Sequence, residues 1–443
     1  MRKAGWAILI AIGLTTTAVA DDSSLLNTDV FQLEVAANPQ ISRDGSKIAY
    51  QRRSMDIMSD RPVAAIWTID VDGSNHRPLL SDTRNYSGHA WSPNGDRLAY
   101  VTDVEGRGPQ VHVMWLDTGH TAVLSNLRQA PSSLTWSPDG RHIAFSMFVP
   151  RKTEPLVAAP ATPEGASWAP PVSVIESLRY RADGRGYLEV GEQHIFVLSA
   201  EGGTARQLTS GAFNHGGRLA WTPNGESIIF AANRKDDWIF DPMESELWSV
   251  DIASGEMAQL TDRDGPDFAP TISPDGSKIA YLGFDDQKMG NHSSQVYIMD
   301  RRSGDIQKLA SDLDREIDRV QWAGSSSRLY IAYDDFGDKV ISSLTVGGKI
   351  DVVTRDVSGV SIGRPYSSGS FSTANNGAFA YTVGRSDRPA DVGTGRGKQK
   401  TRRLTDLNAD ALDHKSVGES EEIRWKSSAD DLEIQGWIVK PPG

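Results

Sequence analysis

The stretch Trp136-Ser137-Pro138-Asp139-Gly140 is the clearest copy of a sequence motif that recurs along this chain, and it is followed by Ile143-Ala144-Phe145. The motif reads as Trp or Ile, then Ser/Thr-Pro-Asp/Asn-Gly, then an apolar run that ends in Tyr or Phe. Proline presets φ, glycine supplies a positive φ, and Asp or Asn bonds back to its own backbone, so each copy predicts a tight turn between two strands. Further copies begin at Ile41, Trp91, Trp221, Ile272 and Trp322, and a seventh keeps only Asn375-Asn376-Gly377 and Phe379-Ala380-Tyr381.

The spacing of these copies indicates the architecture. Successive copies lie 50, 45, 85, 51, 50 and 51 residues apart. A period near 50 residues is typical of propeller blades, because four short strands and their turns need about 40 to 50 residues. Second apolar runs such as 65–70 and 247–251, and later Leu-Thr pairs such as Leu208-Thr209, predict an antiparallel meander in each unit. The sequence therefore predicts an all-β chain with a seven-bladed β-propeller over 21–420, with eight blades as the alternative.

The spacing of 85 residues is the one irregular interval. The segment from Pro150 to Pro171 contains six prolines. Proline cannot donate a hydrogen bond to a strand ladder, so interior strands are excluded there. We expect an insertion at about 150–186 on one face of a blade.

Composition and the N-terminus suggest export. Arg2 and Lys3, an apolar stretch over 4–14 and the small residues Ala18-Val19-Ala20 predict a signal peptide over 1–20. That apolar stretch is too short to span a bilayer. The formal net charge of −12 disfavours nucleic acid as a partner, and the lack of cysteine excludes disulfides and thiol catalysis. We expect a periplasmic or secreted mature chain with no membrane attachment after cleavage.

The G-x-S-x-G pattern over 359–363 is a misleading signal for a serine hydrolase. The pattern needs a strand before Ser361 and a helix after it, but Arg364-Pro365 and a Ser/Gly-rich stretch follow. The one histidine downstream is His414. We therefore assign no catalytic residue, and Ser361 as the nucleophile of a minimal hydrolase is the disfavoured alternative.

Metal and cofactor motifs are weak as well. Asp70-Val71-Asp72-Gly73-Ser74-Asn75 resembles the start of a calcium loop, but its twelfth position is Ser81, where a bidentate Glu is required. The histidines are scattered without metal-ligand spacing. The sequence predicts no metal site and no cofactor.

The pattern changes at the end of the chain. Residues 421–443 predict two strands around Asp430-Asp431, and they include Trp425-Lys426-Ser427 and Gly436-Trp437-Ile438-Val439-Lys440-Pro441-Pro442-Gly443. Together with the Ser-Pro-Asp-Gly repeats and the export signal, this ending resembles the prolyl oligopeptidase family, in its acylaminoacyl-peptidase and bacterial dipeptidyl-peptidase branch. The resemblance implies that 421–443 begins a truncated α/β-hydrolase domain whose Ser, Asp and His would all lie beyond this chain.

The resemblance also implies a function. The chain would be the substrate-gating propeller portion of an exported serine exopeptidase acting on short peptides, with those peptides and its own missing hydrolase domain as partners. A homo-oligomer is compatible with it. Acidic or aromatic groups would hold the peptide amine. The candidate substrate-binding residues are Glu176, Arg179, Tyr180, Asp236, Asp237 and Glu244. The alternative is a non-enzymatic periplasmic β-propeller that acts as a binding scaffold.

Overall fold

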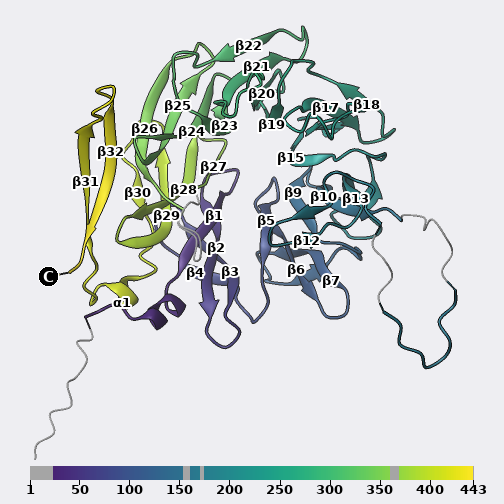
Figure 1. The fold of residues 1–443 in the computed structure, drawn as a ribbon, viewed down its shortest axis with the longest axis horizontal. Helices are drawn as coiled ribbons and strands as arrows, with labels where there is room; N and C mark the ends of the chain where they lie inside the picture. Colours follow the sequence, from purple (N-terminus) through teal and green to yellow (C-terminus); the bar gives the residue numbers. More distant parts are fainter. Residues whose placement is uncertain (1–22, 153–159, 170–173, 360–368, 443) are drawn as a thin grey trace, which may run out of the picture.

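The computed structural model describes residues 23–152, 160–169, 174–359 and 369–442, and Figure 1 shows their sheets arranged around a common centre. Within these residues, strands β1 to β32 are accompanied by a 3-10 helix, η1 (Asn27–Phe31), and by α1 (Ala409–Leu412). The prediction of an all-β chain is confirmed. None of the helices in the described residues has the length and apolar character that crossing a membrane requires.

The first three sheets are antiparallel and have four strands each. Sheet 1 consists of β1 (Val35–Ile41), β2 (Lys47–Asp56), β3 (Arg61–Asp70) and β4 (Arg77–Leu80). Sheet 2 consists of β5 (Ser87–Trp91), β6 (Arg97–Val104), β7 (Gly108–Trp115) and β8 (Thr121–Val123). Sheet 3 consists of β9 (Pro131–Trp136), β10 (His142–Pro150), β13 (Gly191–Ser199) and β14 (Arg206–Gln207).

The later sheets repeat this order. Sheet 4 consists of β15 (Gly216–Trp221), β16 (Ser227–Ala232), β17 (Glu246–Asp251) and β18 (Met257–Gln259). Sheet 5 consists of β19 (Asp267–Ile272), β20 (Lys278–Gly283), β21 (Gln295–Asp300) and β22 (Ile306–Leu309). Sheet 6 has eight strands: β23 (Ile317–Ser325), β24 (Arg328–Asp335), β25 (Asp338–Thr345), β26 (Ile350–Val357), β27 (Phe371–Thr373), β28 (Ala378–Arg385), β29 (Arg388–Arg396) and β30 (Arg402–Arg403). Its two halves, β23–β26 and β27–β30, meet through the pair Val357 and Val383 of β26 and β28.

Two small sheets lie outside these units. The insertion between β10 and β13 carries β11 (Arg181–Ala182) and β12 (Gly186–Tyr187), which pair only with each other in the described residues. At the C-terminal end, β31 (Glu419–Lys426) and β32 (Glu433–Lys440) form a separate hairpin. The signal peptide predicted over 1–20 and Ser361 both lie outside the described residues.

The repeat turn is held by its own side chains. In sheet 3, the Ser137 hydroxyl donates to an Asp139 carboxylate oxygen at 2.5 Å and accepts the backbone N–H of His142 at 2.9 Å. Gly140 closes the turn with φ of +70°, a conformation that costs glycine little. The same hydroxyl-to-amide bond joins Lys47 to Ser42 and Lys278 to Ser273. The turn chemistry of the sequence therefore directly forms the hairpin that starts these sheets.

The repeat tryptophan joins one sheet to the next. The Trp136 indole N–H of sheet 3 donates to the Ala90 carbonyl of sheet 2 at 3.0 Å. The equivalent indole of Trp91 donates to the Gln40 carbonyl of sheet 1 at 2.8 Å. Further bonds of this kind run from Trp221 to the Thr135 carbonyl and from Trp322 to the Thr271 carbonyl. Each acceptor directly precedes the repeat aromatic or Ile of the earlier sheet, so these bonds repeat with the sequence.

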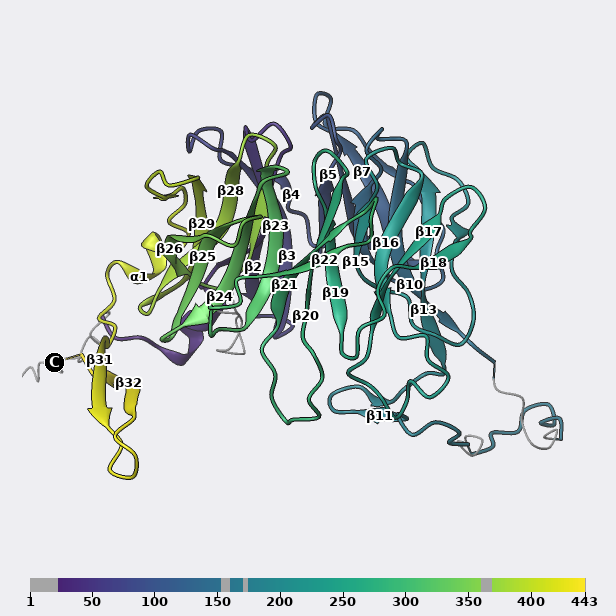
Figure 2. The ribbon, with the colours of Figure 1, turned by 90° about the horizontal axis from the view of Figure 1, so that it is seen from above.

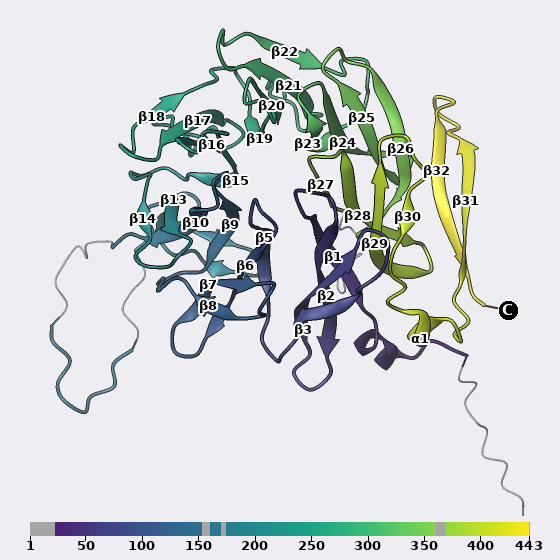
Figure 3. The ribbon, with the colours of Figure 1, turned by 180° about the vertical axis from the view of Figure 1, so that it is seen from behind.

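The ring closes where sheet 1 meets the β27–β30 half of sheet 6, as Figure 3 shows for β1 beside β28 and β29. No strand pairing joins these two sheets in the described residues. Instead, the Ile41 N–H donates to the Ser372 hydroxyl at 2.8 Å. The Asn408 amide both accepts from the Glu34 N–H and donates to the Glu34 carbonyl, each at 2.8 Å. The closure thus relies on side-chain bonds and on a shared apolar cluster that includes Ile48 and Ala380.

Antiparallel connections place successive loops on alternate sides of the ring. The Ser-x-Asp-Gly turns lie on one side, which we call the turn face. The connections between the second and third strands of each sheet, including 233–245, 284–294 and the described part of the insertion at 174–190, lie on the other side, which we call the loop face. Figure 2 shows the β31–β32 hairpin and the β11 segment extending from the same side of the ring. The hairpin contacts the β24–β25 turn there, because the Gln435 amide donates to the Phe336 carbonyl at 2.7 Å.

The indole bonds lead to a stability prediction. Replacing Trp136 by Phe removes the donor to the Ala90 carbonyl from a side chain that is only 7% exposed. We expect W136F to lose about 1 to 3 kcal/mol of unfolding free energy, measured by urea titration. The control W425F alters an indole that is 49% exposed, and it should leave the free energy unchanged. Equal effects of the two substitutions would contradict a structural role for the bond.

Candidate functional site

A charged cavity opens on sheet 4, where the loop face carries the connection 233–245. Its volume is about 380 Å³. The walls come from this connection, from the facing ends of β17 and β18, and from the link to β19. They are formed by Asn233, Arg234, Lys235, Glu244, Glu246, Trp248, Gln259, Asp262, Arg263 and Asp264. We call this the Glu244 cavity.

Glu244 is the acid in this wall that retains an unbound oxygen. The side chain is 4% exposed. Its Oε2 accepts the Gly265 N–H at 3.2 Å and lies 3.1 Å from the Lys235 ammonium. Its Oε1 is buried and has no hydrogen-bond partner among the described residues. A buried carboxylate oxygen without a partner is costly, and a cationic donor entering the cavity would satisfy it.

Glu246 has a structural role that recurs elsewhere in the ring. The Thr261 hydroxyl accepts the Leu247 N–H at 2.9 Å and donates to the Glu246 carboxylate. In the last half-sheet, Thr405 accepts the Val392 N–H at 2.9 Å and donates to Asp391 at 2.7 Å. The Leu-Thr pairs of the sequence therefore end the fourth strand of a sheet by anchoring it to the start of the third.

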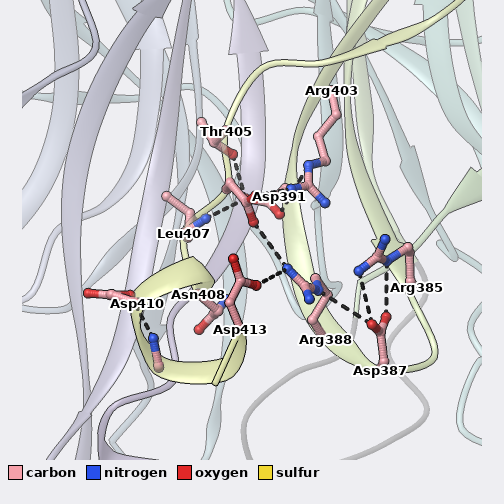
Figure 4. A network of polar contacts seen from close by, with 12 residues as sticks. Arg385, Asp387, Arg388, Asp391, Arg403, Thr405, Leu407, Asn408, Asp410 and Asp413 are labelled. Atoms are coloured by element: carbon pink, nitrogen blue, oxygen red, sulfur yellow. Dashed lines mark hydrogen bonds and ion pairs between the residues drawn. The ribbon is translucent and has the colours of Figure 1, made fainter. Parts of the chain in front are cut away.

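The surroundings of these two acids differ. Figure 4 shows Asp391 beside Thr405, Leu407 and Arg403, and Asp391 accepts the Leu407 N–H at 2.9 Å. Nearby, Arg388 pairs with Asp413 at 3.2 Å, which ties the last half-sheet to α1. Glu246 lies instead among other carboxylates.

Crowding of carboxylates changes the protonation of Glu246. Burial raises the pKa of Glu246 to about 8, and the negative charges of Asp267 and Glu244 add to this effect against the opposing Thr261 hydroxyl bond. Burial also raises the pKa of Asp267, although Asp267 pairs with Arg263. Arg263 further pairs with Asp285 at 2.8 Å. The raised pKa favours the protonated form of Glu246 at neutral pH, and a side-chain hydrogen bond with Glu244 contributes to the rise.

Of the basic groups in the wall, Lys235 pairs with Glu244, whereas Arg234 is engaged elsewhere. The Arg234 guanidinium bonds to a His215 ring nitrogen and stacks 5.2 Å from the Trp248 ring. Burial, and then the Arg234 charge, lower the pKa of His215 to about 4, so the ring is neutral and accepts this bond. Lys235 also lies 3.5 Å from Asp241.

The structure separates the six residues predicted from the sequence. Glu244 alone among them lines the cavity described here. Asp236 and Asp237 are exposed on the outside of the same connection, with Phe240 beside them 76% exposed.

The other three predicted residues belong to the insertion. Glu176, Arg179 and Tyr180 are all exposed, and the Tyr180 ring lies 6.1 Å from that of Tyr187. All six residues thus share the loop face, but no bond described here joins the insertion group to the Glu244 cavity.

Sequence reasoning missed Glu246, Arg263 and Asp267. A usable signal was present, because Glu246 directly precedes the apolar run 247–251 and lies fifteen residues before the Thr of a Leu-Thr pair. Asp267 carried no such signal. Within the described residues, no group of three or more His, Asp or Glu side chains is arranged to hold a metal ion.

Comparison with known proteins finds related peptidases. A family profile described as the dipeptidyl peptidase IV (DPP IV) N-terminal region matches residues 171–281. The uncharacterized peptidase YuxL of Bacillus subtilis is 24% identical over 93% of this chain and 63% of its own length. Dipeptidyl-peptidase 5 of Porphyromonas gingivalis is 21% identical over 98% of this chain and 64% of its own length.

Solved structures agree on the fold. An acylaminoacyl peptidase, solved in complex with Z-Gly-Gly-Phe-chloromethyl ketone, superposes with a TM-score of 0.72 at 18% identity, over 93% of this chain and 58% of that one. The β-propeller domain of the Trilobed protease from Pyrococcus furiosus, described as having an open velcro topology, gives a TM-score of 0.57 at 13% identity over 85% of this chain and 97% of that one. The predicted propeller fold is thereby confirmed.

These matches define the class of fold, which is a β-propeller of the kind found in peptidases. The predicted resemblance to the prolyl oligopeptidase family is confirmed, and the matches correspond to that family's N-terminal propeller region. The chain spans less than two thirds of the length of the two curated relatives described above.

The raised pKa of Glu246 predicts a pH-dependent stability. Glu246 holds its proton more tightly in the folded state than in the unfolded state, where its pKa is near 4.5. The stabilisation of the fold by protonated Glu246 is therefore complete below pH 4.5 and is lost as the pH rises to about 8. Gln cannot ionise, and E246Q should therefore be more stable than the parent chain at pH 9 by about 1.4 kcal/mol for each pKa unit of the shift.

Urea unfolding at two pH values checks this expectation. The gain of E246Q should be present at pH 9 and absent at about pH 4. The control E256Q, at an exposed acid on the turn face of the same sheet, should behave as the parent at both values. A loss of stability for E246Q that is equal at both pH values would contradict a protonated Glu246.

Proposed function

We propose that this chain is the substrate-gating propeller portion of an exported serine exopeptidase that acts on short peptides. In this proposal each half of sheet 6 is a blade, which gives seven blades, and 421–443 begins an α/β-hydrolase domain that continues beyond this chain. The leader over 1–20 directs the protein to the periplasm or outside the cell. Two similar proteins support exopeptidase chemistry: one is named a dipeptidyl-peptidase and the other an acylaminoacyl peptidase.

One observation carries the proposal. The Glu244 cavity and the β31–β32 hairpin both lie on the loop face. A domain that continues from the hairpin would therefore start on the side of the ring where the unbound carboxylate oxygen is. The turn face, by contrast, is built from short repeat turns whose polar groups bond to one another.

The chemistry of the cavity suits the free amine of a peptide. An ammonium group donates three hydrogen bonds, and bonds to a carboxylate are stronger than those between neutral groups. Glu244 Oε1 has no partner in the described residues, whereas its Oε2 is already bound. Trp248 offers apolar surface in the same cavity. An exopeptidase needs a group that binds the terminal amine, because this contact fixes how far from the N-terminus the peptide is cleaved.

The natural gene beyond codon 443 tests the proposed domain arrangement. We expect an open frame with a strand-flanked G-x-S-x-G, followed by an acid and a histidine in that order. A stop codon directly after codon 443 in the natural gene would contradict the proposal and favour a binding scaffold.

Peptide binding to the 443-residue chain tests the role of Glu244. We expect Ala-Phe-Ala-Ala with a free amine to bind more tightly than its N-acetylated form, measured by calorimetry. E244Q should reduce binding of the free peptide about tenfold, because it removes the charge that faces the ammonium group.

Two comparisons complete this test. E256Q, on the turn face of the same sheet, should bind as the parent chain does. Equal binding of free and acetylated peptide, or an equal loss in E244Q and E256Q, would show that Glu244 does not hold the amine.

A further inference from the structure

A second cavity lies on the axis of the ring, and its charge differs from that of the chain. Its volume is about 860 Å³, and its walls come from the innermost strands of all six sheets. Arg43, Arg218 and Arg319 contribute to these walls. Asp318 is the only acid among the described lining residues, although the whole chain has a net charge of −12.

The carboxylate of Asp318 is already engaged. It pairs with the ammonium group of Lys339, a side chain that is 7% exposed. Within the described residues, none of the three arginines of the cavity has an ion-pair partner. The charge of Asp318 raises the pKa of Arg319 against the effect of burial, so the chain itself offsets only part of the positive charge in the cavity.

A local irregularity of the backbone places Arg218 in the cavity. In β1, β5 and β19, two residues of the innermost strand lie opposite one residue of its neighbour, which is a bulge of one extra residue. In β15, by contrast, Gly216 pairs with Ala231 and Ala220 pairs with Ile229, so this bulge contains two extra residues. Gly217 begins it with φ of +73°. Bulges re-aim side chains, and this one turns Arg218 inward.

Arg218 then reaches across a neighbouring sheet. Its guanidinium donates to the Val320 carbonyl of β23 at 2.8 Å, although β19 lies between β15 and β23 in the ring. This bond uses one of the five N–H donors of the Arg218 guanidinium.

Arg319 adds a second guanidinium to the same region. It neighbours Val320 in β23, and its guanidinium lies 6.0 Å from the ring of the buried Phe371. Burial, and then the charge of Arg319, lower the pKa of Arg218 to about 10, and burial lowers the pKa of Arg319. Two like charges held this close destabilise each other, and an anion between them would relieve the repulsion.

We propose that the axial cavity binds an organic carboxylate through Arg218 and Arg319. The planar guanidinium matches a carboxylate in a bidentate arrangement. Trp91, Trp136 and Leu219 in the same wall suit an apolar body attached to the charge. A free carboxylic acid and the C-terminal carboxylate of a short peptide share this chemistry. The inference does not depend on the proposed function, because it requires neither cleavage nor the Glu244 cavity.

The fluorescence of the chain provides the test, because Trp91 and Trp136 line the cavity. We expect N-acetylphenylalanine to change the emission and to bind about tenfold more tightly than its neutral amide, at constant ionic strength. R319Q should lose this preference for the acid. R218Q should also lose the preference for the acid. R218K keeps the positive charge but cannot bind a carboxylate in a bidentate arrangement, so it should retain only part of the preference.

Controls separate the cavity from general charge effects. R141Q removes an arginine whose side chain is 81% exposed on the turn face, and it should bind as the parent chain does. Ala-Ala-Phe and its C-terminal amide distinguish the two sources of carboxylate. Preference for the peptide acid over N-acetylphenylalanine would identify a peptide end, and the reverse order a free acid.

Three results would overturn the proposal. Equal binding of acid and amide would show that the carboxylate is not recognised. Binding of sulfate with no binding of organic acids would show that the site is not for carboxylates. An acid preference retained in R319Q would place the site elsewhere, and this variant decides the matter even if R218Q fails to fold.

Discussion

The bond from a repeat tryptophan to the backbone of the preceding sheet sets the geometry on which the rest of this ring depends. The indole of Trp136 reaches the Ala90 carbonyl, and that of Trp322 reaches the Thr271 carbonyl. Because each acceptor directly precedes the repeat aromatic or Ile of the earlier sheet, the same offset is imposed at the four junctions that have this bond. Buried backbone carbonyls require partners, so the bond also satisfies polar groups at the sheet junctions.

The junctions at Ile41 and Ile272 lack this bond, because neither residue has an indole, and the first of them closes the ring. Ile41 occupies the repeat position of sheet 1 and has no indole, so the last junction uses the Ser372 hydroxyl and the Asn408 amide instead. No strand is shared between the first and last sheets in the described residues. The ring is therefore closed by bonds that could be broken without unfolding any sheet.

The sequence predicts the scaffold well because the scaffold is local. The Ser-Pro-Asp-Gly turn at Ser137 needs only residues within its own hairpin. The regular spacing of such turns is visible in the amino-acid sequence. The two cavities could not be predicted in the same way. Glu244 is buried where it meets Gly265 and Lys235, and Arg218 lies in a bulge with two extra residues, neither of which the sequence reveals. Asp236 and Asp237 resembled Glu244 in sequence, but they lie on the exposed side of the same connection.

The two faces of the ring thus have different tasks. On the turn face, short side chains bond to their own backbone and hold the hairpins. On the loop face, long connections bury the Glu244 carboxylate, and the axial cavity between the faces gathers arginines. Negative charge at one site and positive charge at the other suit molecules that carry both an amine and a carboxylate. Short peptides have this property.

The cleavage of peptides of graded length by the product of the complete natural gene tests the account most directly. Substrates of the same N-terminal sequence, from a tetrapeptide to a folded protein with that sequence exposed at its N-terminus, would be compared by kcat/KM. The account predicts rapid cleavage of short peptides with a free amine, and a steep fall to no cleavage for the folded protein. Cleavage of the folded protein at the rate of the tetrapeptide, or no peptide cleavage by the complete product, would contradict it.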